Sequence, residues 1–458
     1  MTKGKQKNIN SGSNSPLRAL GLHPALRTAG ITRGAAGTIY LRDQNLKLEE
    51  AVGLALAIGL EIASARIIEL ARPNPATFLG SGKVEEFGAL IEAEDIDLVV
   101  MDCALNPIQQ RNLERAWKVK VIDRTGLILE IFGERAQTRE GTLQVELAHL
   151  TYQKSRLVRT WTHLERQRGG FGFLGGPGER QIESDRRQIQ ERITRIRKEL
   201  GTVAKRRALH RKARRAVPYP IISLAGYTNA GKSTLFNLLT GAGVDAEDKL
   251  FATLDPTLRA LIVPGGRKVI LSDTVGFISD LPTELVAAFR ATLEEVREAD
   301  LILHVRDASN PERDAQKHDV LNVLKTLKVD ARIPVIEVLN KVDLLEEADR
   351  EALLKQAARR HDILPLSALS GQGVEELLYV VAALFEAGEP EVTVVLPEGE
   401  GKAHAWLHQH GRVLAEKPGA GEVTLRVRLG DKFIGQFKKE FPGLKLRRKR
   451  KQKPRMIA

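Results

Sequence analysis

One cysteine in 458 residues, Cys103, excludes an intramolecular disulfide and a cysteine-based metal cluster. No stretch reaches the roughly eighteen consecutive apolar residues that a membrane-spanning helix needs. The first forty residues contain Gly, Ser, Arg and Lys without a continuous apolar run, so no secretory signal is visible. These absences favour a reducing compartment, and we expect a cytoplasmic protein.

The length and charge of the chain give the first positive indications. A length of 458 residues predicts about three domains of ordinary size. The formal net charge is +13, and the surplus lies between residues 154 and 215, where 19 basic residues stand against 6 acidic ones. Because such a local excess attracts polyanions, we expect a polyanionic partner.

The first third of the chain predicts a small parallel α/β domain behind a loose start. We expect residues 1–45 to form a flexible extension and residues 46–140 to form the domain. Its apolar strands and amphipathic helices alternate, which is typical of a parallel sheet covered by helices. The expected strands are 67–70, 98–101 and 119–122, and the expected helices are 85–91 and 107–117.

Residues 141–216 change to a helical period. Apolar residues recur at spacings of three, four and seven, which predicts two helices that pack as an antiparallel hairpin. The connection at residues 169–178 holds six glycines and a proline, so neither helix continues through it. We expect a basic rod with a flexible, partly apolar tip. The apolar residues are Leu143, Leu147, Leu150, Leu157, Trp161 and Leu164, then Ile182, Ile189, Ile193, Ile196 and Leu200.

A second α/β pattern covers residues 217–388. A strand at 221–225 leads into a glycine-rich loop and then a helix, which is the context that a phosphate loop requires. Backbone N–H groups of such a loop bind phosphate oxygens at a helix N-terminus. We expect Lys232 to reach the β- and γ-phosphates and Ser233 to bind Mg²⁺. The loop consists of Gly226, Tyr227, Thr228, Asn229, Ala230, Gly231, Lys232 and Ser233.

Two further segments predict the magnesium and γ-phosphate contacts. The first is Asp273, Thr274, Val275 and Gly276 at the end of a strand; its Asp can hold the magnesium shell through water, and its Gly N–H can sense the γ-phosphate. The second is Phe251, Ala252, Thr253, Leu254 and Asp255, which we expect to order with GTP and loosen with GDP. Thr253 is the predicted magnesium ligand, and spacing alone leaves Thr257 as its competitor.

A fourth segment predicts guanine as the base. Asp343 follows a strand and can accept hydrogen bonds from N1–H and the amino group of guanine, a pair of donors that adenine lacks. The segment is Asn340, Lys341, Val342 and Asp343. Ser367, Ala368 and Leu369 follow the next strand and can add a backbone contact to the guanine oxygen. The bound species are therefore expected to be GTP or GDP with Mg²⁺.

One residue at this site predicts slow hydrolysis. Phe277 follows Gly276 at the position where Ras-like enzymes carry the glutamine that orients the attacking water. A phenyl ring neither donates nor accepts a hydrogen bond, so we expect Lys232, Thr253 and Gly276 to support slow turnover that a partner accelerates.

These motifs closely resemble those of the HflX family of GTPases, relatives of the Obg group. The likeness rests on residues 226–233, 251–257, 273–278 and 340–343, and it extends upstream through 78–86, 121–125, 143–148 and 176–179. It departs from the family pattern at Arg180 and Ile182. The resemblance implies a P-loop GTPase domain with a mostly parallel sheet, a small N-terminal parallel α/β domain, a helical hairpin and, at 389–458, a small α+β domain with a basic tail.

The resemblance also implies a function. Proteins of this family bind the large ribosomal subunit and its RNA, dissociate stalled or idle ribosomes under stress, and hydrolyse GTP faster on the ribosome. It implies a monomer that associates with ribosomes, without DNA as a partner and without a transmembrane segment. The tip of the hairpin would contact ribosomal RNA.

Two other function classes are weighed against this one. Gly80, Ser81, Gly82 and Lys83 would suit an ATP-dependent RNA-remodelling factor acting through the N-terminal domain, but a turn with Ser81 as the helix N-cap explains the same residues better. The third class is a passive RNA-binding module with a vestigial GTPase domain, and the intact Lys232, Ser233 and Asp343 argue against it.

Overall fold

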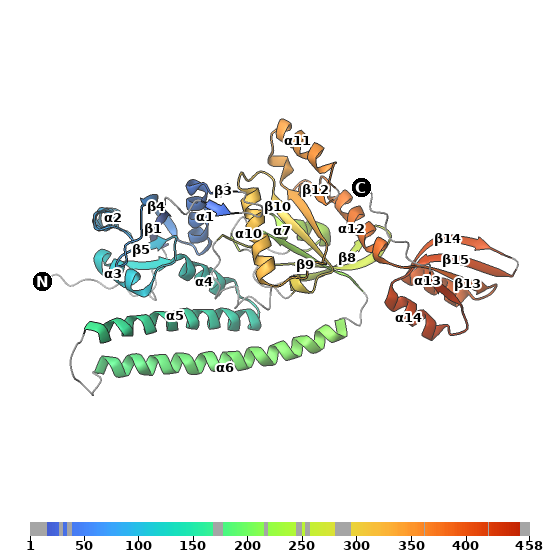
Figure 1. Ribbon diagram of the computed structural model, residues 1–458, viewed down its shortest axis with the longest axis horizontal. Coiled ribbons are helices and arrows are strands. Elements are labelled where there is room, and N and C mark those ends of the chain that lie inside the picture. The colour runs from blue at the N-terminus through green and yellow to red at the C-terminus, as the bar shows by residue number, and fades with distance from the viewer. Residues whose placement is uncertain are drawn as a thin grey trace.

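The structure is a computed structural model. It describes residues 16–26, 31–33, 39–167, 177–214, 219–243, 250–251, 257–279, 295–360, 362–419 and 421–448. Figure 1 shows three sheet-containing parts in a row, in chain order, with a long helical hairpin alongside the first two. This arrangement confirms the predicted fold class of an α/β GTPase domain with an N-terminal parallel domain, a hairpin and a C-terminal α+β domain.

The N-terminal domain is a four-stranded parallel sheet in the order β4-β1-β5-β6. Its strands are β1 Arg18–Leu26, β4 Glu61–Leu70, β5 Leu98–Met101 and β6 Lys120–Asp123. Its helices are α1 Gln44–Ala57, α2 Ser81–Ala93, α3 Pro107–Trp117 and α4 Arg124–Arg135. A separate antiparallel pair joins β2 Ile31–Arg33 to β3 Ile39–Leu41.

The prediction of a flexible extension through residue 45 is wrong for strand β1. This strand lies inside the sheet with β4 on one side and β5 on the other, and Ala19, Leu20 and Leu22 are almost completely buried. Gly21 and Pro24 interrupt its apolar pattern and both are rare in strands, so local propensity argues against it. Burial between two parallel neighbours outweighs that propensity.

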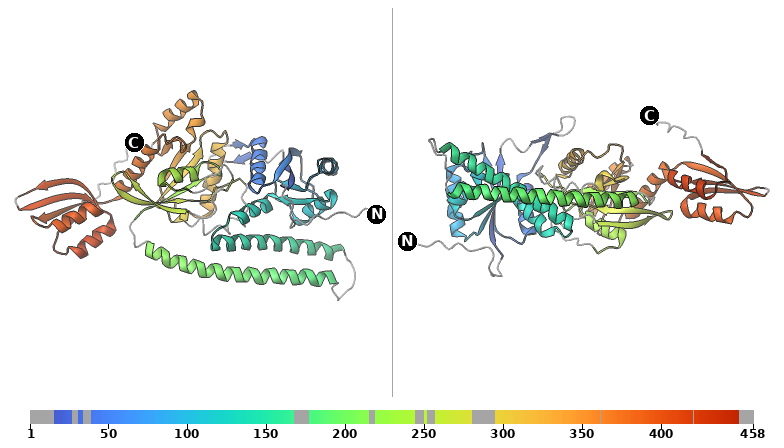
Figure 2. Two further views of the ribbon diagram at one scale, coloured as in Figure 1. Left: turned by 180° about the vertical axis from the view of Figure 1, so that it is seen from behind. Right: turned by 90° about the horizontal axis from the view of Figure 1, so that it is seen from below.

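The helical hairpin consists of α5 Arg139–Gln167 and α6 Pro177–Arg214, which lie side by side (Figures 1 and 2). Leu143 on α5 and Ile193 and Ile196 on α6 are buried, as the heptad pattern predicts. A bidentate ion pair joins Arg192 to Glu146 across the two helices at 2.7 and 2.9 Å. The glycine-rich tip lies outside the described residues, apart from the first turn of α6.

The central domain carries a six-stranded sheet in the order β12-β11-β10-β7-β9-β8. All neighbours are parallel except β8 and β9, which pair antiparallel. The strands are β7 Ile221–Gly226, β8 Thr257–Val263, β9 Arg267–Asp273, β10 Leu301–Asp307, β11 Val335–Asn340 and β12 Ile363–Pro365. The helices are α7 Lys232–Thr240, α10 Arg313–Thr326, α11 Glu347–Ala357 and α12 Val374–Gly388, with a 3₁₀ turn at Val342–Leu344.

The C-terminal domain is an antiparallel sheet in the order β14-β15-β13-β16 with helices α13 and α14. The elements follow each other as β13 Glu391–Pro397, α13 Gly401–His410, β14 Arg412–Pro418, β15 Glu422–Arg428, α14 Asp431–Glu440 and β16 Leu446–Arg448. Its core includes Val392, Val394 and Phe437, all buried.

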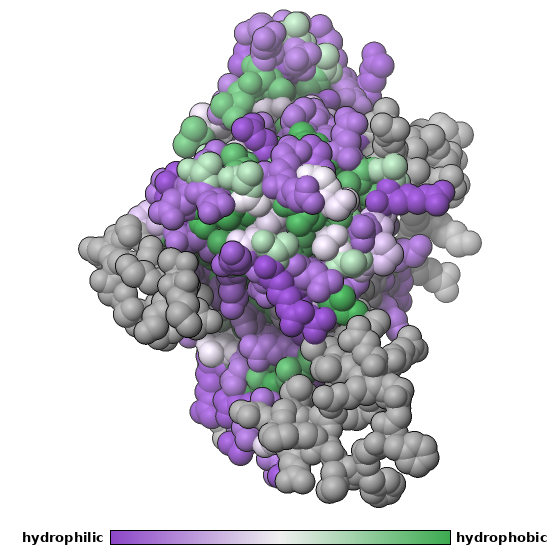
Figure 3. Space-filling view, turned by 90° about the vertical axis from the view of Figure 1, so that its left-hand side faces the viewer, coloured by the Kyte–Doolittle hydropathy of each residue, from purple (hydrophilic) through white to green (hydrophobic). Residues whose placement is uncertain are grey.

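Seen from the end that carries the N-terminal domain, hydrophilic residues cover much of the described surface, with smaller apolar areas between them (Figure 3). Within the described part of the chain, no helix combines the length and the apolar character that crossing a bilayer demands.

Candidate nucleotide-binding site

The phosphate loop lies between the carboxyl end of β7 and the N-terminus of α7, at the centre of the six-stranded sheet. Gly226 and Gly231 are required there for steric reasons. A Cβ on Gly226 would lie 2.1 Å from the carbonyl oxygen of Val305, and one on Gly231 would lie 2.2 Å from the amide nitrogen of Asn340. Gly231 also has a φ of 86°, which L-residues rarely adopt. These two glycines therefore let the loop pack closely against β10 and Asn340.

Lys232 lies buried inside this loop. Its ammonium group donates a hydrogen bond of 2.7 Å to the carbonyl oxygen of Tyr227. Burial lowers the pKa of Lys232 to about 8, and the negative charge of Asp273 raises it in part. A phosphate group would supply the negative charge that this buried ammonium needs, which fits the role predicted for Lys232.

The predicted magnesium residues lie next to each other. Ser233 donates a hydrogen bond of 2.8 Å to the buried carboxylate of Asp273. Gly276 packs against the same loop, because a Cβ there would lie 2.8 Å from the methyl group of Thr228. The hydroxyl group and the carboxylate thus face each other, and both carry hard oxygen atoms of the kind that Mg²⁺ and its bound water prefer.

The candidate guanine end is organised by Asn340. Its side chain donates to the carbonyl oxygen of Ala230 at 2.9 Å and accepts from the backbone N–H of Ala368 at 2.8 Å. It therefore holds the phosphate loop and the loop after β12 together. Lys341 has a φ of 65° and forms an ion pair with Asp307 at 2.8 Å. Asp343 is exposed, with its carboxylate available to a base.

The remaining predicted residues take different positions. Val342, Ser367 and Ala368 are buried, whereas Leu369 is 82% exposed. Ala252, Thr253, Leu254 and Asp255 lie outside the described residues. Thr257, the competitor of Thr253, begins β8 and pairs with Asp273 in the β8–β9 ladder.

Phe277 is buried and its backbone holds two strands of the site together. Its N–H donates to the carbonyl oxygen of Gly226 at 3.0 Å, and its carbonyl accepts from the N–H of Thr228 at 2.7 Å. The ring belongs to an apolar cluster that includes residues of the N-terminal domain, such as Leu127 and Phe132. The Phe277 side chain therefore packs in a core.

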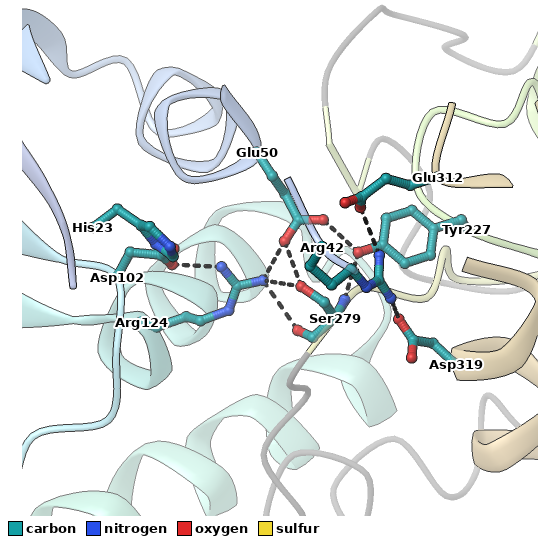
Figure 4. A network of polar contacts seen from close by, with 9 residues as sticks. All are labelled: His23, Arg42, Glu50, Asp102, Arg124, Tyr227, Ser279, Glu312 and Asp319. Carbon is teal, nitrogen blue, oxygen red and sulfur yellow. Dashed lines mark hydrogen bonds and ion pairs between the residues drawn. The ribbon is translucent and has the colours of Figure 1, made fainter. Parts of the chain in front are cut away.

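A polar network between the two domains reaches the phosphate loop, and sequence reasoning missed its N-terminal members (Figure 4). The hydroxyl group of Tyr227 hydrogen-bonds to Glu50 on α1 and accepts from the backbone N–H of Ser279 at 2.6 Å. Ser279 also donates from its hydroxyl group to Glu50 at 2.8 Å. Burial, and then the negative charge of Glu50, raise the pKa of Tyr227 well above its ordinary value, so its hydroxyl group keeps its proton.

Arg124, the first residue of α4, extends this network into the N-terminal domain. It donates to Glu50 and to Asp102, each at 2.5 Å, and to the carbonyl oxygen of Ser279 at 3.0 Å. Burial acts to lower the pKa of Arg124, but the carboxylates of Asp102 and Glu50 outweigh it and hold the pKa above its ordinary value. A second set of interdomain ion pairs joins Arg42 to Glu312, at 2.7 Å, and to Asp319.

The network also continues to the middle of helix α5, the first helix of the hairpin. Asp123, which precedes Arg124, accepts from the hydroxyl group of Tyr152 at 2.6 Å and from Arg156 at 2.7 Å. Both partners are on α5. The phosphate loop, the segment after Gly276, the N-terminal domain and the hairpin are therefore joined by consecutive buried or half-buried contacts.

The residues 80–83 do not form a second phosphate loop. Gly80 is the N-cap of α2 and Ser81 is its first helical residue, so the prediction of Ser81 as N-cap is wrong by one position. The ammonium group of Lys83 pairs with Glu86 of the same helix at 2.7 Å. A turn precedes the helix where a phosphate loop would have a strand.

The fold and the site together define a P-loop GTPase. On a mostly parallel sheet, a strand leads into a glycine-bearing loop with a buried lysine, and Ser233 pairs with Asp273 beside it. Family models match in four consecutive segments: a GTP-binding GTPase N-terminal region at residues 45–133, its middle region at 135–214, a 50S ribosome-binding GTPase at 221–341 and an HflX C-terminal domain at 352–446.

Relatives extend the match over most of the chain. The GTPase HflX of Magnetococcus marinus is 51% identical over 86% of this chain and 90% of its own length. That of Escherichia coli is 43% identical over 85% of this chain and 91% of its own length. The chain therefore belongs to the HflX family of GTPases and is a GTP hydrolase. It is also similar to the solved structure of a GTP-binding protein from Sulfolobus solfataricus in complex with GDP, at 24% identity and a TM-score of 0.44, over 80% of this chain and 98% of that one.

Proposed function

We propose that this protein is a GTP-switched factor that binds the large ribosomal subunit and dissociates stalled or idle ribosomes. The observation that carries the proposal is the chain of contacts from Tyr227 through Glu50 to Arg124, and from the adjacent Asp123 to helix α5 of the hairpin. The match of residues 221–341 to a 50S ribosome-binding GTPase supports the choice of partner.

The proposed site holds GTP by its two ends. The loop around Lys232 binds the phosphates, with Ser233 and Asp273 ordering Mg²⁺ and its water shell. Asp343 selects guanine through two hydrogen bonds. Thr253 completes the magnesium shell when the γ-phosphate is present, and Gly276 binds that phosphate through its N–H.

Nucleotide exchange would move the segment that follows Gly276. Ser279 is three residues further on and is held by Tyr227, Glu50 and Arg124. A shift of this segment toward a γ-phosphate changes these contacts, and buried charge pairs respond to small displacements because removing one partner is costly. The N-terminal domain and the hairpin then take a different position for each nucleotide.

Hydrolysis is proposed to be slow without the ribosome. The buried ring of Phe277 cannot orient a water molecule, so the attacking water lacks the side chain that a Ras-like enzyme supplies. On the ribosome, a partner group or a rearranged loop of this chain would supply the missing contact. The enzyme then releases the subunit after hydrolysis rather than before it.

The hairpin supplies the RNA contact. Its basic residues outnumber its acidic ones, and exposed Arg186, Arg187 and Arg195 lie on the described part of α6. Such residues bind the phosphate backbone without reading sequence. Monomeric action and a cytoplasmic location are part of the proposal.

Light scattering of intact ribosomes tests the dissociation. We expect the full chain to lower the scattering of 70S ribosomes with GTP or a non-hydrolysable GTP analogue, and not with GDP or ATP. Asp343→Asn should abolish the effect with GTP, whereas Asp349→Asn, an exposed acidic residue of α11, should not. Dissociation driven equally by ATP would instead support the remodelling class.

A further inference from the structure

The sheet of the C-terminal domain has one uncovered face. Helices α13 and α14 both pack on the opposite side, where Leu407 and Phe437 contact the buried side chains of β13 and β15. Figures 1 and 2 show both helices on the same side of this sheet, and no other described element lies over the second side. The strand register identifies the residues of that second side, because directly paired residues project to the same face.

Basic residues dominate this uncovered face. The register places twelve residues on it in four cross-strand rows, and we call them the C-terminal basic face. Five are basic and two are acidic, and none is aromatic. The rows are Glu391, Arg428 and Arg412; then Arg447, Thr393, Arg426 and Ala415; then Val395, Thr424 and Lys417; then Pro397 and Glu422.

The carboxylates on and beside this face are fewer than its cations and do not neutralise their charge. Arg428 lies directly opposite Arg412, an arrangement of like charges that destabilises a sheet. Both turn to one carboxylate, that of Glu386 on α12, with Arg428 at 4.0 Å. Arg426 approaches Glu391 at 3.4 Å.

Two more basic residues add to the positive charge of the C-terminal basic face. Lys417 and Arg447 are exposed, and neither has an ion pair with any residue that the structure describes. In the sequence, Arg447 is followed by four more basic residues, Arg448, Lys449, Arg450 and Lys451. The face therefore offers net positive charge to an anionic partner.

We propose that the C-terminal basic face binds the phosphate backbone of helical RNA. Four of its five cations are arginines, whose guanidinium groups bind phosphate oxygens in a bidentate manner. A flat array of such groups suits the wide, shallow minor groove of an A-form helix and its flanking phosphates.

The composition of the face separates this partner from other polyanions. Single-stranded RNA bound on a sheet of this kind stacks its bases on aromatic side chains, and this face has none. A membrane surface would require large apolar side chains to enter the lipid, and the apolar members of this face are the small residues Val395, Ala415 and Pro397. That the RNA belongs to the ribosome rests on the function proposed above. The binding of helical RNA to this face does not depend on that function.

Salt-dependent binding of a duplex tests the proposal. The full chain is titrated into a labelled RNA duplex of about 20 base pairs with no ribosomal sequence, at several salt concentrations. Each phosphate contact contributes about 0.9 to the slope of log K against log salt. We expect Arg426→Ala with Arg447→Ala to reduce that slope by about 2 and to weaken binding at least tenfold near ~0.1 M salt.

The matched control removes two charges from the other side of the same domain. Lys438 and Lys439 are exposed on α14, so the variant Lys438→Ala with Lys439→Ala should leave the slope almost unchanged. The basic hairpin binds equally in both variants, so their difference isolates the sheet. Equal slopes for the two variants would overturn the proposal while leaving ribosome-stimulated GTP hydrolysis untouched.

A labelling experiment locates the RNA directly. In a Cys103→Ser background, Thr424→Cys places a thiol on the face and Gln436→Cys places one on exposed α14. We expect the duplex to slow maleimide labelling at position 424 and not at 436. Protection by phosphatidylserine vesicles with none by RNA would overturn the proposal in favour of a membrane, and protection by neither would overturn it outright.

Discussion

The hydroxyl group of Tyr227, in the phosphate loop, hydrogen-bonds to the carboxylate of Glu50, which lies 177 positions earlier on helix α1 of the N-terminal domain. The same hydroxyl group accepts from the N–H of Ser279, so one oxygen joins the loop, the segment after Gly276 and the neighbouring domain. A residue of the phosphate loop thus faces the N-terminal domain through its side chain.

The variant Tyr227→Phe tests this contact between the two domains. The substitution keeps the ring and removes the oxygen, which leaves Glu50 and the Ser279 N–H short of a partner in a buried setting. We expect it to lower the free energy of unfolding by about 1–3 kcal/mol, measured from the urea transition in which the two domains separate. Tyr219→Phe is the control, because Tyr219 is 40% exposed. Identical transitions for the two variants would refute the account of this contact.

A double-mutant cycle measures the coupling between Arg124 and Glu50. Arg124→Met leaves two buried carboxylates without their cation, and breaking such a pair costs about 3–5 kcal/mol. Adding Glu50→Gln removes one of those charges, so the double variant should recover at least about 1 kcal/mol of the loss. The control, Arg332→Met, breaks an exposed ion pair with Asp330 and should leave the transition unchanged. Strict additivity of the two substitutions would show that Arg124 and Glu50 do not act together.

We predict that the specificity for guanine depends on Asp343. Asp343→Asn should weaken GTP binding by roughly two to four orders of magnitude, since two hydrogen bonds to a charged group contribute about 1.5–3 kcal/mol each. Xanthine carries an oxygen where guanine carries its amino group, so the new amide should recover binding of xanthosine triphosphate. Titration with fluorescent nucleotides measures both, with Asp349→Asn as the control. Unchanged GTP affinity would remove Asp343 from the site.

The pKa of Lys232 predicts a pH dependence. Burial lowers it to about 8 in the protein without nucleotide, and bound phosphate favours the charged form again. Nucleotide binding should therefore take up about half a proton at pH 8 and more at pH 9, and affinity should fall as pH rises through 8. Calorimetry of GDP binding in buffers of different ionisation enthalpy measures the uptake. Lys232→Arg, which stays charged, should show none, and an absence of uptake in the parent protein would contradict the assignment.

The sequence predicts the strand, loop and helix around Lys232 well because their signals are local. Gly226, Lys232 and Ser233 follow a strand and open a helix within a few positions, and the structure brings Ser233 and Asp273 to hydrogen-bond distance. The parallel sheet of the N-terminal domain also follows from the local alternation of strands and helices.

The polar contacts between the N-terminal and central domains could not be predicted in the same way. Glu50 and Arg124 are ordinary charged residues in their own helices, and their partners Tyr227 and Ser279 lie 177 and 155 positions away. No periodicity marks a charged residue as buried when its counter-charge comes from another domain. Strand β1 was missed for a related reason, since its burial depends on two strands that come later in the chain.

The rate of GTP hydrolysis with and without purified large ribosomal subunits tests the account most directly. We predict slow turnover by the full chain alone and a rise of at least about a hundredfold at saturating subunits, because Phe277 stands where a Ras-like enzyme carries its water-orienting glutamine and a partner must compensate for it. Turnover that is fast without subunits, or that does not respond to them, would contradict the account.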